Sequence, residues 1–197
     1  MKPDVFNPGY ATTDELRSFN FSHVGDNVMI ARNCTLIGLE NIHIDDNVRI
    51  DGYTTISAAS GHCCIGRNIH IGGTSHLACS GGIELADFVN LSQGVRIYTV
   101  SDDYSGSAMT NPTVPKQFTN VSVAPVTLGK HVIVGSGSVV LPGSELGEGV
   151  AVGALSLVNR SLDPWGVYGG IPVRLIKARS KDLLDAERRY LNLEKTV

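Results

Sequence analysis

Residues Leu128 to Val158 read LGKHVIVGSGSVVLPGSELGEGVAVGALSLV, and aliphatic side chains recur at every sixth position of this stretch. The recurring residues are Leu128, Val134, Val140, Leu146, Val152 and Val158. A helix repeats about every 3.6 residues and a half-buried strand about every two, so a strict period of six fits neither element by itself. It is typical of a short strand followed by a turn, repeated, which is the hexapeptide pattern of a parallel β-helix.

The same register continues towards the N-terminus. With three hexapeptides to each triangular coil, the coils begin at Val24, Ile44, Ile65, Leu85, Leu128 and Leu146. Successive starts are 20, 21, 20, 43 and 18 residues apart, so the early coils carry two or three extra residues at one corner. The long step predicts one insertion, the loop 101–125. We therefore predict an all-β solenoid, a parallel β-helix of about six triangular coils.

In such a coil, each phased aliphatic residue and the residue two positions before it should point inward, because side chains alternate along a strand. The chain of 197 residues fits a single domain, 1–197. Within it we expect an N-terminal cap at 1–23, the β-helix at 24–163 with its loop at 101–125, and a C-terminal segment at 164–197.

Short helices are expected in both flanking segments. Thr12 and Glu15 have the spacing of a capping box, which predicts a helix from Asp14 to Ser18 that covers the open first coil. Ser180 can cap a helix from Lys181 to Leu193. That second helix should pack on a neighbouring subunit or cover the other end of the solenoid.

The bulk composition excludes several classes of function. A net charge of −3 gives no general attraction to nucleic acid or to an anionic membrane. The sequence shows no signal segment and no apolar run near 18 residues, so we expect a cytoplasmic protein without membrane insertion. The four cysteines are expected to be reduced and structural, with Cys34 facing inward and Cys63 and Cys64 at a corner.

The candidate chemistry is sparse. His23, His43 and His62 are expected to be solvated residues at turns or beside strands. His76 precedes an inward leucine and should point outward, on a face where subunits would pack, so it is a candidate for an interface or an active site. Asp102 and Asp103 are the densest ionisable pair in the inserted loop. A loop of this length in a compact repeat is usually functional or disordered.

The hexapeptide ladder, the single long loop and the closing GGIPVRLIKAR (169–179) together resemble the left-handed β-helix acyltransferases. The similarity is greatest to the galactoside, xenobiotic and polysaccharide O-acetyltransferases. The resemblance implies a left-handed coil, a homotrimer with active sites between subunits, and acetyl-CoA as co-substrate without a metal. The acceptor would be a sugar, a sugar nucleotide or a surface-polysaccharide precursor.

Two positions of this chain depart from the family pattern. The catalytic histidine of the galactoside-type enzymes corresponds to Asp102, and a tryptophan that borders their pocket corresponds to Ile133. The positions that approach coenzyme A fit better: they are Gly135, Ser136, Gly153 and Ala154 along the pantetheine arm, Asn159 near the cofactor, and Arg174 and Lys177 near the nucleotide phosphates. Small residues leave strand backbone open to a ligand, and cations suit phosphates.

Several alternatives stay open. We predict that His76 of one subunit and Asp102 or Asp103 of another share one cleft, with His76 as the base and the aspartate orienting it, because the reference pKa of an imidazole, about 6.5, suits a base near neutral pH. Alternatively an aspartate acts directly, or the chain is a degenerate homologue that binds or assembles without catalysis. A metal-dependent hydratase of the γ-carbonic-anhydrase type ranks last, because the six histidines lack the expected spacing. The acceptor, the acyl group and the choice between O- and N-transfer also stay open.

Overall fold

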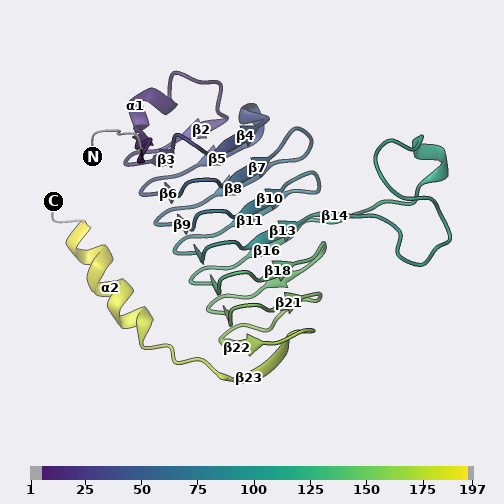
Figure 1. Cartoon of the computed structure of the whole chain (residues 1–197). Coiled ribbons are helices and arrows are strands. Elements are labelled where there is room, and N and C mark those ends of the chain that lie inside the picture. Colours follow the sequence, from purple (N-terminus) through teal and green to yellow (C-terminus); the bar gives the residue numbers. More distant parts are fainter. Residues whose placement is uncertain (1–5, 195–197) are drawn as a thin grey trace.

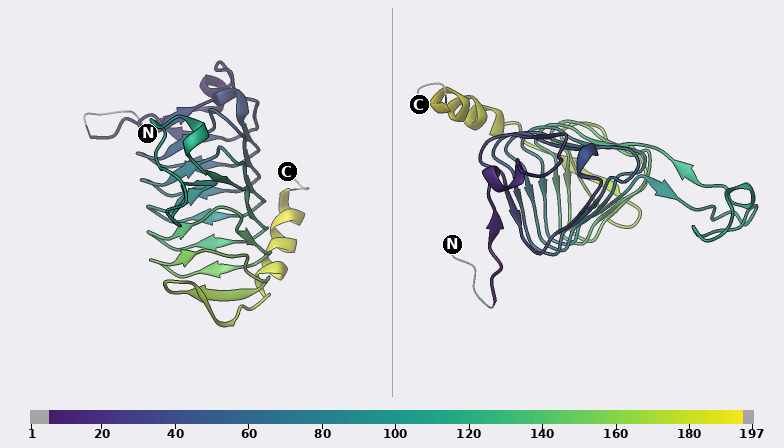
Figure 2. Two further views of the ribbon diagram at one scale, coloured as in Figure 1. Left: turned by 90° about the vertical axis from the view of Figure 1, so that its right-hand side faces the viewer. Right: turned by 90° about the horizontal axis from the view of Figure 1, so that it is seen from above.

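The computed structural model describes residues 6–194, and the predicted cap and C-terminal segment extend beyond them at 1–5 and 195–197. The chain winds into a parallel β-helix with a triangular cross-section, which confirms the predicted fold class (Figures 1 and 2). Three sheets form its faces and are here named A, B and C. A search of the described residues finds no helix that is both long and apolar enough to cross a membrane.

Sheet A has nine strands, from β1 at one end to β23 at the other. They are β1 (Tyr10–Ala11), β3 (Met29–Ala31), β6 (Arg49–Ile50), β9 (His70–Ile71), β12 (Asn90–Leu91), β17 (Ile133–Val134), β20 (Ala151–Val152), β22 (Gly166–Gly169) and β23 (Arg174–Ala178). The first and the last pair of strands are antiparallel, and the intervening pairs are parallel. Each end of the sheet is therefore closed by a strand that reverses direction.

Sheets B and C have six parallel strands each. Sheet B consists of β2 (His23–Val24), β5 (Ile42–Ile44), β8 (Cys63–Ile65), β11 (Ile83–Leu85), β16 (Val126–Leu128) and β19 (Glu145–Leu146). Sheet C consists of β4 (Thr35–Ile37), β7 (Thr55–Ser57), β10 (His76–Ala78), β13 (Arg96–Tyr98), β18 (Val139–Val140) and β21 (Leu157–Val158). The chain visits the sheets in the order B, A, C in every coil.

The interior follows the six-residue ladder that the sequence predicts. Leu77, Ile97 and Val140 lie in register on adjacent strands of sheet C and are fully buried. The residues two positions earlier point inward as well, and include the buried Ser75 and Ser138. Buried apolar surface stabilises a fold by about 25 cal/mol per Å². A column of aliphatic side chains through every coil is thus the main source of stability.

The corners explain where glycine and asparagine occur. The third residue after a ladder position adopts a left-handed backbone conformation in most coils, as at Asn47 (φ 59°) and Gly137 (φ 69°). Glycine and asparagine tolerate that conformation best. The extra residues of the early coils all enlarge the corner between sheets C and B, and the long loop leaves the coil at the same corner (Figure 1).

The loop projects away from the coil (Figures 1 and 2). Its stem is the antiparallel pair β14 (Val100–Ser101) and β15 (Ser122–Val123), and a 3₁₀ helix spans Lys116–Phe118. Several large apolar side chains of the loop are exposed, including Tyr104 (94%) and Val123 (59%). They bury little surface against their own coil.

The N-terminal helix α1 (Thr13–Leu16) is shorter than predicted, but its capping box between Thr12 and Glu15 is present. The backbone N–H of Thr12 donates to Glu15 Oε2 at 2.8 Å. Leu16 is buried against the first coil, where a second 3₁₀ helix spans Leu39–Asn41. The helix therefore covers apolar ladder residues at that end, as its sequence indicates.

The C-terminal helix α2 (Leu183–Glu194) does not cover the end of the solenoid, so that one of its two predicted placements is wrong. It lies beside the edge between sheets B and A, where Glu187 contacts Lys130 and His131, and the Tyr190 ring packs edge-on against Phe88. The closing role falls instead to the β22–β23 hairpin. The charged and aromatic side of α2 packs at this edge because Lys130 provides a cation there and His131 and Phe88 provide two rings.

Two further local expectations were wrong. Cys63 and Cys64 lie within strand β8 and not at a corner; Cys63 points inward and is fully buried, whereas Cys64 points outward. His23 and His43 likewise lie in strands, β2 and β5, rather than in turns. Before β5 and β8 the enlarged corner ends earlier than expected, so the strand starts two residues before its phased isoleucine, and β2 starts one residue before Val24. All four cysteines are free thiols.

Candidate active site

The edge between sheets A and C brings together four of the residues predicted to contact coenzyme A. Gly135 and Ser136 follow β17, and Gly153 and Ala154 follow β20 one coil later. Backbone hydrogen bonds connect the two coils: Leu155 N donates to Ser136 O at 2.9 Å. We call this border, comprising residues 92–94, 135–137 and 153–155, the A–C edge.

Small residues let successive coils approach closely at the A–C edge. A Cβ atom added to Gly135 would lie 2.4 Å from the backbone nitrogen of Ala154, so a larger residue would displace the next coil. Ser136, Gly153 and Ala154 are exposed. The edge therefore presents a run of accessible backbone that a long, amide-containing chain can lie along.

The edge continues in both directions. Towards the N-terminus, Ser92 occupies the same position one coil before Gly135, and its backbone N–H donates to Val134 O at 2.9 Å. Its side-chain hydroxyl has no hydrogen-bond partner among residues 6–194. Towards the C-terminus, Gly153 N donates to Tyr168 O at 2.8 Å, and Gly169 carries the edge into the final hairpin.

The three remaining predicted cofactor residues are distributed differently. Arg174 pairs with Gly169 in the β22–β23 hairpin, so this exposed cation lies where the A–C edge ends. Lys177 pairs with Val167 at the other end of the same strand and is also exposed. Asn159 lies beyond β21, at the corner between sheets C and B, and β21 separates it from Ala154.

The two loop aspartates have different surroundings. Asp103 accepts hydrogen bonds from Ser105 N (2.8 Å), Ser107 Oγ (2.8 Å) and Ala108 N (2.9 Å). These bonds from Ser105, Ser107 and Ala108 hold the pKa of the Asp103 carboxyl well below its ordinary value. A carboxylate stabilised in this way is a poor proton acceptor. Asp103 therefore serves the conformation of the loop.

Asp102 is exposed, and its carboxylate has no partner among the residues that the structure describes. It borders a cavity of about 390 Å³ in the loop. The cavity is lined by Val100, Ser101, Asp102, Asn111, Pro112, Val114, Lys116, Thr119 and Val121. Of the two aspartates, only Asp102 is free to meet a ligand.

His76 points outward from β10, as predicted, and its ring centroid lies 5.7 Å from that of Tyr98. It pairs with Arg96 across sheet C, whereas Asp102 lies six residues further along that coil. At about 3.3 Å per residue this is up to about 20 Å. Within the described residues, His76 contacts Tyr98, whereas Asp102 borders the loop cavity, and no hydrogen bond, ion pair or ring contact joins the two side chains. Ser92 and Asp102 are likewise separated by β13.

Comparison with known proteins places this geometry in a family. No protein-family model matches the chain. A dTDP-4-amino-4,6-dideoxy-D-glucose acyltransferase of Escherichia coli is 42% identical over 178 residues, which is 90% of this chain and 93% of that protein. The chain thus belongs to the hexapeptide-repeat sugar acyltransferases. It is an acyl-CoA-dependent acyltransferase with a sugar acceptor, as the sequence indicates, and not a hydratase.

Within that class it is similar to AntD, an N-acyltransferase from Bacillus cereus. The AntD complex with dTDP-4-amino-4,6-dideoxyglucose and coenzyme A superimposes with a TM-score of 0.89 and 39% identity, over 93% of this chain and 98% of AntD. AntD was also solved with dTDP and 3-hydroxybutyryl-CoA. A maltose O-acetyltransferase from Clostridium difficile superimposes with a TM-score of 0.57 and 25% identity, over 85% and 74% of the two chains.

The AntD structures include variants at a serine and at an aspartate ten positions later. This chain has one serine–aspartate pair with that spacing, Ser92 and Asp102. Sequence reasoning singled out Asp102 but missed Ser92, because a serine after a short strand has no distinguishing pattern in a solenoid rich in serine. Its position beside Gly135 on the A–C edge is the signal that the structure adds.

Proposed function

We propose that the enzyme N-acylates an amino sugar carried on a nucleotide, such as dTDP-4-amino-4,6-dideoxyglucose, from an acyl-CoA. This replaces the O-transfer that the family resemblance implied. The observation that carries the proposal is the free carboxylate of Asp102 where the sugar O-acetyltransferases have a histidine. A carboxylate is a weaker base than an imidazole and gives little help to a sugar hydroxyl.

An amine makes a smaller demand on the base. The neutral amine attacks the thioester carbonyl through its own lone pair, which forms the C–N bond and a tetrahedral oxyanion. The nitrogen is then positively charged and strongly acidic, so the Asp102 carboxylate can accept its proton. Collapse of the oxyanion breaks the C–S bond, and the thiolate leaving group takes up a proton. The products are the amide and free coenzyme A.

The other residues have separate roles in this proposal. The A–C edge from Ser136 to Ala154 binds the pantetheine arm, and Arg174 and Lys177 approach the nucleotide phosphates, with Asn159 as a further polar contact. Ser92 lies on the same edge, one coil before Gly135, and its hydroxyl would hydrogen-bond the acceptor amine or the oxyanion.

The direct test is an acceptor comparison. Release of coenzyme A from acetyl-CoA or 3-hydroxybutyryl-CoA is followed with a thiol reagent, with dTDP-4-amino-4,6-dideoxyglucose, dTDP-glucose or maltose as acceptor. We expect turnover with the amino sugar and at least about 100-fold less with either hydroxyl acceptor. Equal or faster turnover with a hydroxyl acceptor would refute N-transfer, and no turnover with any of them would favour the degenerate-homologue alternative.

Variants then locate the base. Asp102→Asn should lower turnover by about 10²-fold or more, the usual scale for a positioned base. Asp163→Asn is the matched control, because Asp163 is also exposed with no carboxylate partner among residues 6–194. His76→Ala should leave turnover within a few-fold. A loss of about 10²-fold for His76→Ala with an active Asp102→Asn would instead assign the base to the imidazole.

We further propose that the active form is a homotrimer whose sites lie between subunits. Two observations support this: the loop projects from its own coil with apolar side chains exposed, and β13 separates Ser92 from Asp102 within a chain. Sedimentation should give three times the chain mass. A monomer over a wide concentration range would refute this assembly.

Complementation tests the shared site itself. Ser92→Ala and Asp102→Asn chains are each expected to be inactive alone. Mixed trimers should recover about a quarter of wild-type activity, because one interface in four pairs an intact Ser92 with an intact Asp102 from different chains. If both residues act within one chain, no mixed trimer contains an intact site, and activity will not return.

A further inference from the structure

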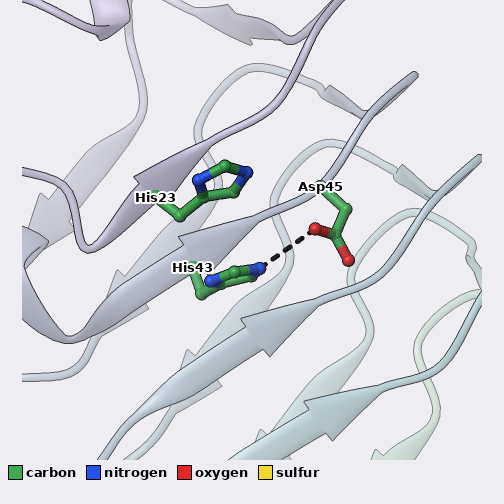
Figure 3. A group of neighbouring side chains, drawn as sticks. All are labelled: His23, His43 and Asp45. Carbon is green, nitrogen blue, oxygen red and sulfur yellow. Dashed lines mark hydrogen bonds and ion pairs between the residues drawn. The ribbon is translucent and has the colours of Figure 1, made fainter.

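Two histidines lie side by side on the outer face of sheet B, far along the fold from the A–C edge. His23 of β2 and His43 of β5 are register partners in neighbouring parallel strands. Their rings are stacked, with centroids 4.6 Å apart and planes inclined by 24° (Figure 3). The strand spacing of about 4.8 Å imposes this arrangement on any two outward side chains at these positions.

A carboxylate completes the group. Asp45 follows His43 by two residues, points to the same side, and its Oδ1 lies 3.0 Å from His43 Nε2 (Figure 3). One potential ligand atom from each of the three residues lies within 4.8 Å of the other two. Ligand atoms around a tetrahedral zinc ion are about 3.3 Å apart, given metal–ligand distances of about 2.0–2.1 Å. Because the lone pairs of stacked imidazoles are nearly parallel, the two rings would turn out of the stack to direct one nitrogen each at a shared ion.

The surroundings favour a cation at this place. Neither ring nitrogen of His23 has a hydrogen-bond partner among the described residues, so that imidazole is available as a ligand. His43 and Asp45 each have 40% of the side chain exposed, which leaves the group open to solvent. A groove of about 750 Å³ begins at His43 and Asp45 and runs along sheet B. Its ionisable lining is predominantly acidic: Asp45, Glu84, Asp87, Glu145 and Glu148 against Lys130 and His43.

We propose that His23, His43 and Asp45 bind one divalent transition-metal ion, with zinc as the physiological type and solvent as the fourth ligand. Two imidazoles and one carboxylate suit zinc, cobalt or nickel better than magnesium or calcium, which prefer oxygen ligands. The ion would connect β2, the terminal strand of sheet B, to the second coil. The role of the ion is structural, because it would add a link between the edge strand β2 and its neighbour β5. Acyl transfer is assigned to the A–C edge and not to this group.

The test is zinc titration of the chelator-treated, full-length enzyme by calorimetry. We expect one zinc ion per chain, undisturbed by millimolar magnesium, and a rise of about 5–10 °C in the melting temperature at saturation. His23→Gln and His43→Gln should each weaken zinc binding by about 100-fold or more, beyond the effect of losing an outer-sphere partner. The visible absorption of bound cobalt should disappear in both variants.

His62→Gln is the matched control. His62 is also exposed beside a carboxylate on this face, with Nε2 3.5 Å from Glu84 Oε1, but among residues 6–194 no second imidazole stacks on it. It should bind zinc as the wild type does. Acyl-transfer turnover and circular dichroism of the zinc-free variants report folding, and both should match the wild type. Absence of saturable zinc binding by the wild type, or equal binding by His23→Gln, would overturn the proposal.

Discussion

Replacement of Glu187 by glutamine should release α2 from the coil. Glu187 Oε2 lies 2.9 Å from His131 Nε2, and its other carboxylate oxygen accepts a hydrogen bond from Lys130. The side chains of His131 and Glu187 are only 9% and 10% exposed. Glutamine has the same shape but no charge, so the variant leaves a buried imidazole without a carboxylate partner.

The size of the effect follows from these contacts. A hydrogen bond to a charged group contributes about 1.5–3 kcal/mol, and the Lys130 contact adds little because that side chain is more than one-third exposed. The docking of α2 should therefore weaken by about 2 kcal/mol, which is about a 30-fold change in its opening equilibrium. Backbone hydrogen exchange within residues 183–194 should become faster by that factor, as measured by mass spectrometry, while exchange in sheets B and C stays unchanged.

Asp185→Asn is the control on the same helix. Asp185 pairs with Arg188, but both side chains are largely exposed, so this change should alter exchange by less than about threefold. Unchanged exchange of α2 in Glu187→Gln, or an equal effect of Asp185→Asn, would refute the assignment of Glu187 as the anchor. Faster exchange throughout the chain would show that the residue supports the whole coil and not the helix alone.

The same contact predicts a pH dependence. Burial alone would raise the pKa of Glu187, but the hydrogen bonds from Lys130 and His131 outweigh it, and the pKa is lowered from its ordinary value of 4.5. A carboxyl whose pKa is lower in the folded state contributes stability that is present above the unfolded-state pKa and lost as the pH falls through the folded-state value. Docking of α2 should weaken below about pH 4.5, and Glu187→Gln should remove that dependence.

Three further predictions concern the A–C edge and the core. Ser136→Trp should raise the KM for acyl-CoA by about 10-fold or more, because an indole would cover the edge, while Ser60→Trp at the corner between sheets C and B should not. An unchanged KM would mean that the cofactor lies elsewhere. Arg174→Ala should raise the KM for acetyl-CoA several-fold but not that for acetyl-dephospho-CoA; equal effects on both would exclude a contact with the 3′-phosphate. Leu77→Ala should cost about 2–5 kcal/mol of stability, because Leu77 is fully buried, and circular dichroism should show a lower melting temperature; an unchanged temperature would contradict the role of the ladder.

The coil itself could be predicted from the sequence because its determinants are local and repeated. The six-residue period from Leu128 to Val158 fixes which side chains point inward. The same period can be followed through each of the other coils, so the repeats support one another. The capping box at Thr12 was readable for the same reason, since it involves neighbouring residues. The position of α2 was not, because it depends on Phe88, Lys130 and His131 meeting one side of a helix more than 50 residues away.

The candidate sites also differ in how much of them the sequence reveals. The run of small residues at 135–136 and 153–154 was visible in the sequence, since equal phase in successive coils means adjacency in space. Ser92 and the His23–His43–Asp45 group were not recognised. The 20-residue step already implies that His23 and His43 are neighbours, but the outward stacking of their rings and the approach of Asp45 to His43 appear only in the structure. The sequence by itself thus determined the ladder and its phase. Only the tertiary structure decided what surrounds each outward side chain, because those contacts join α2, the loop and the coil, which are far apart in the sequence.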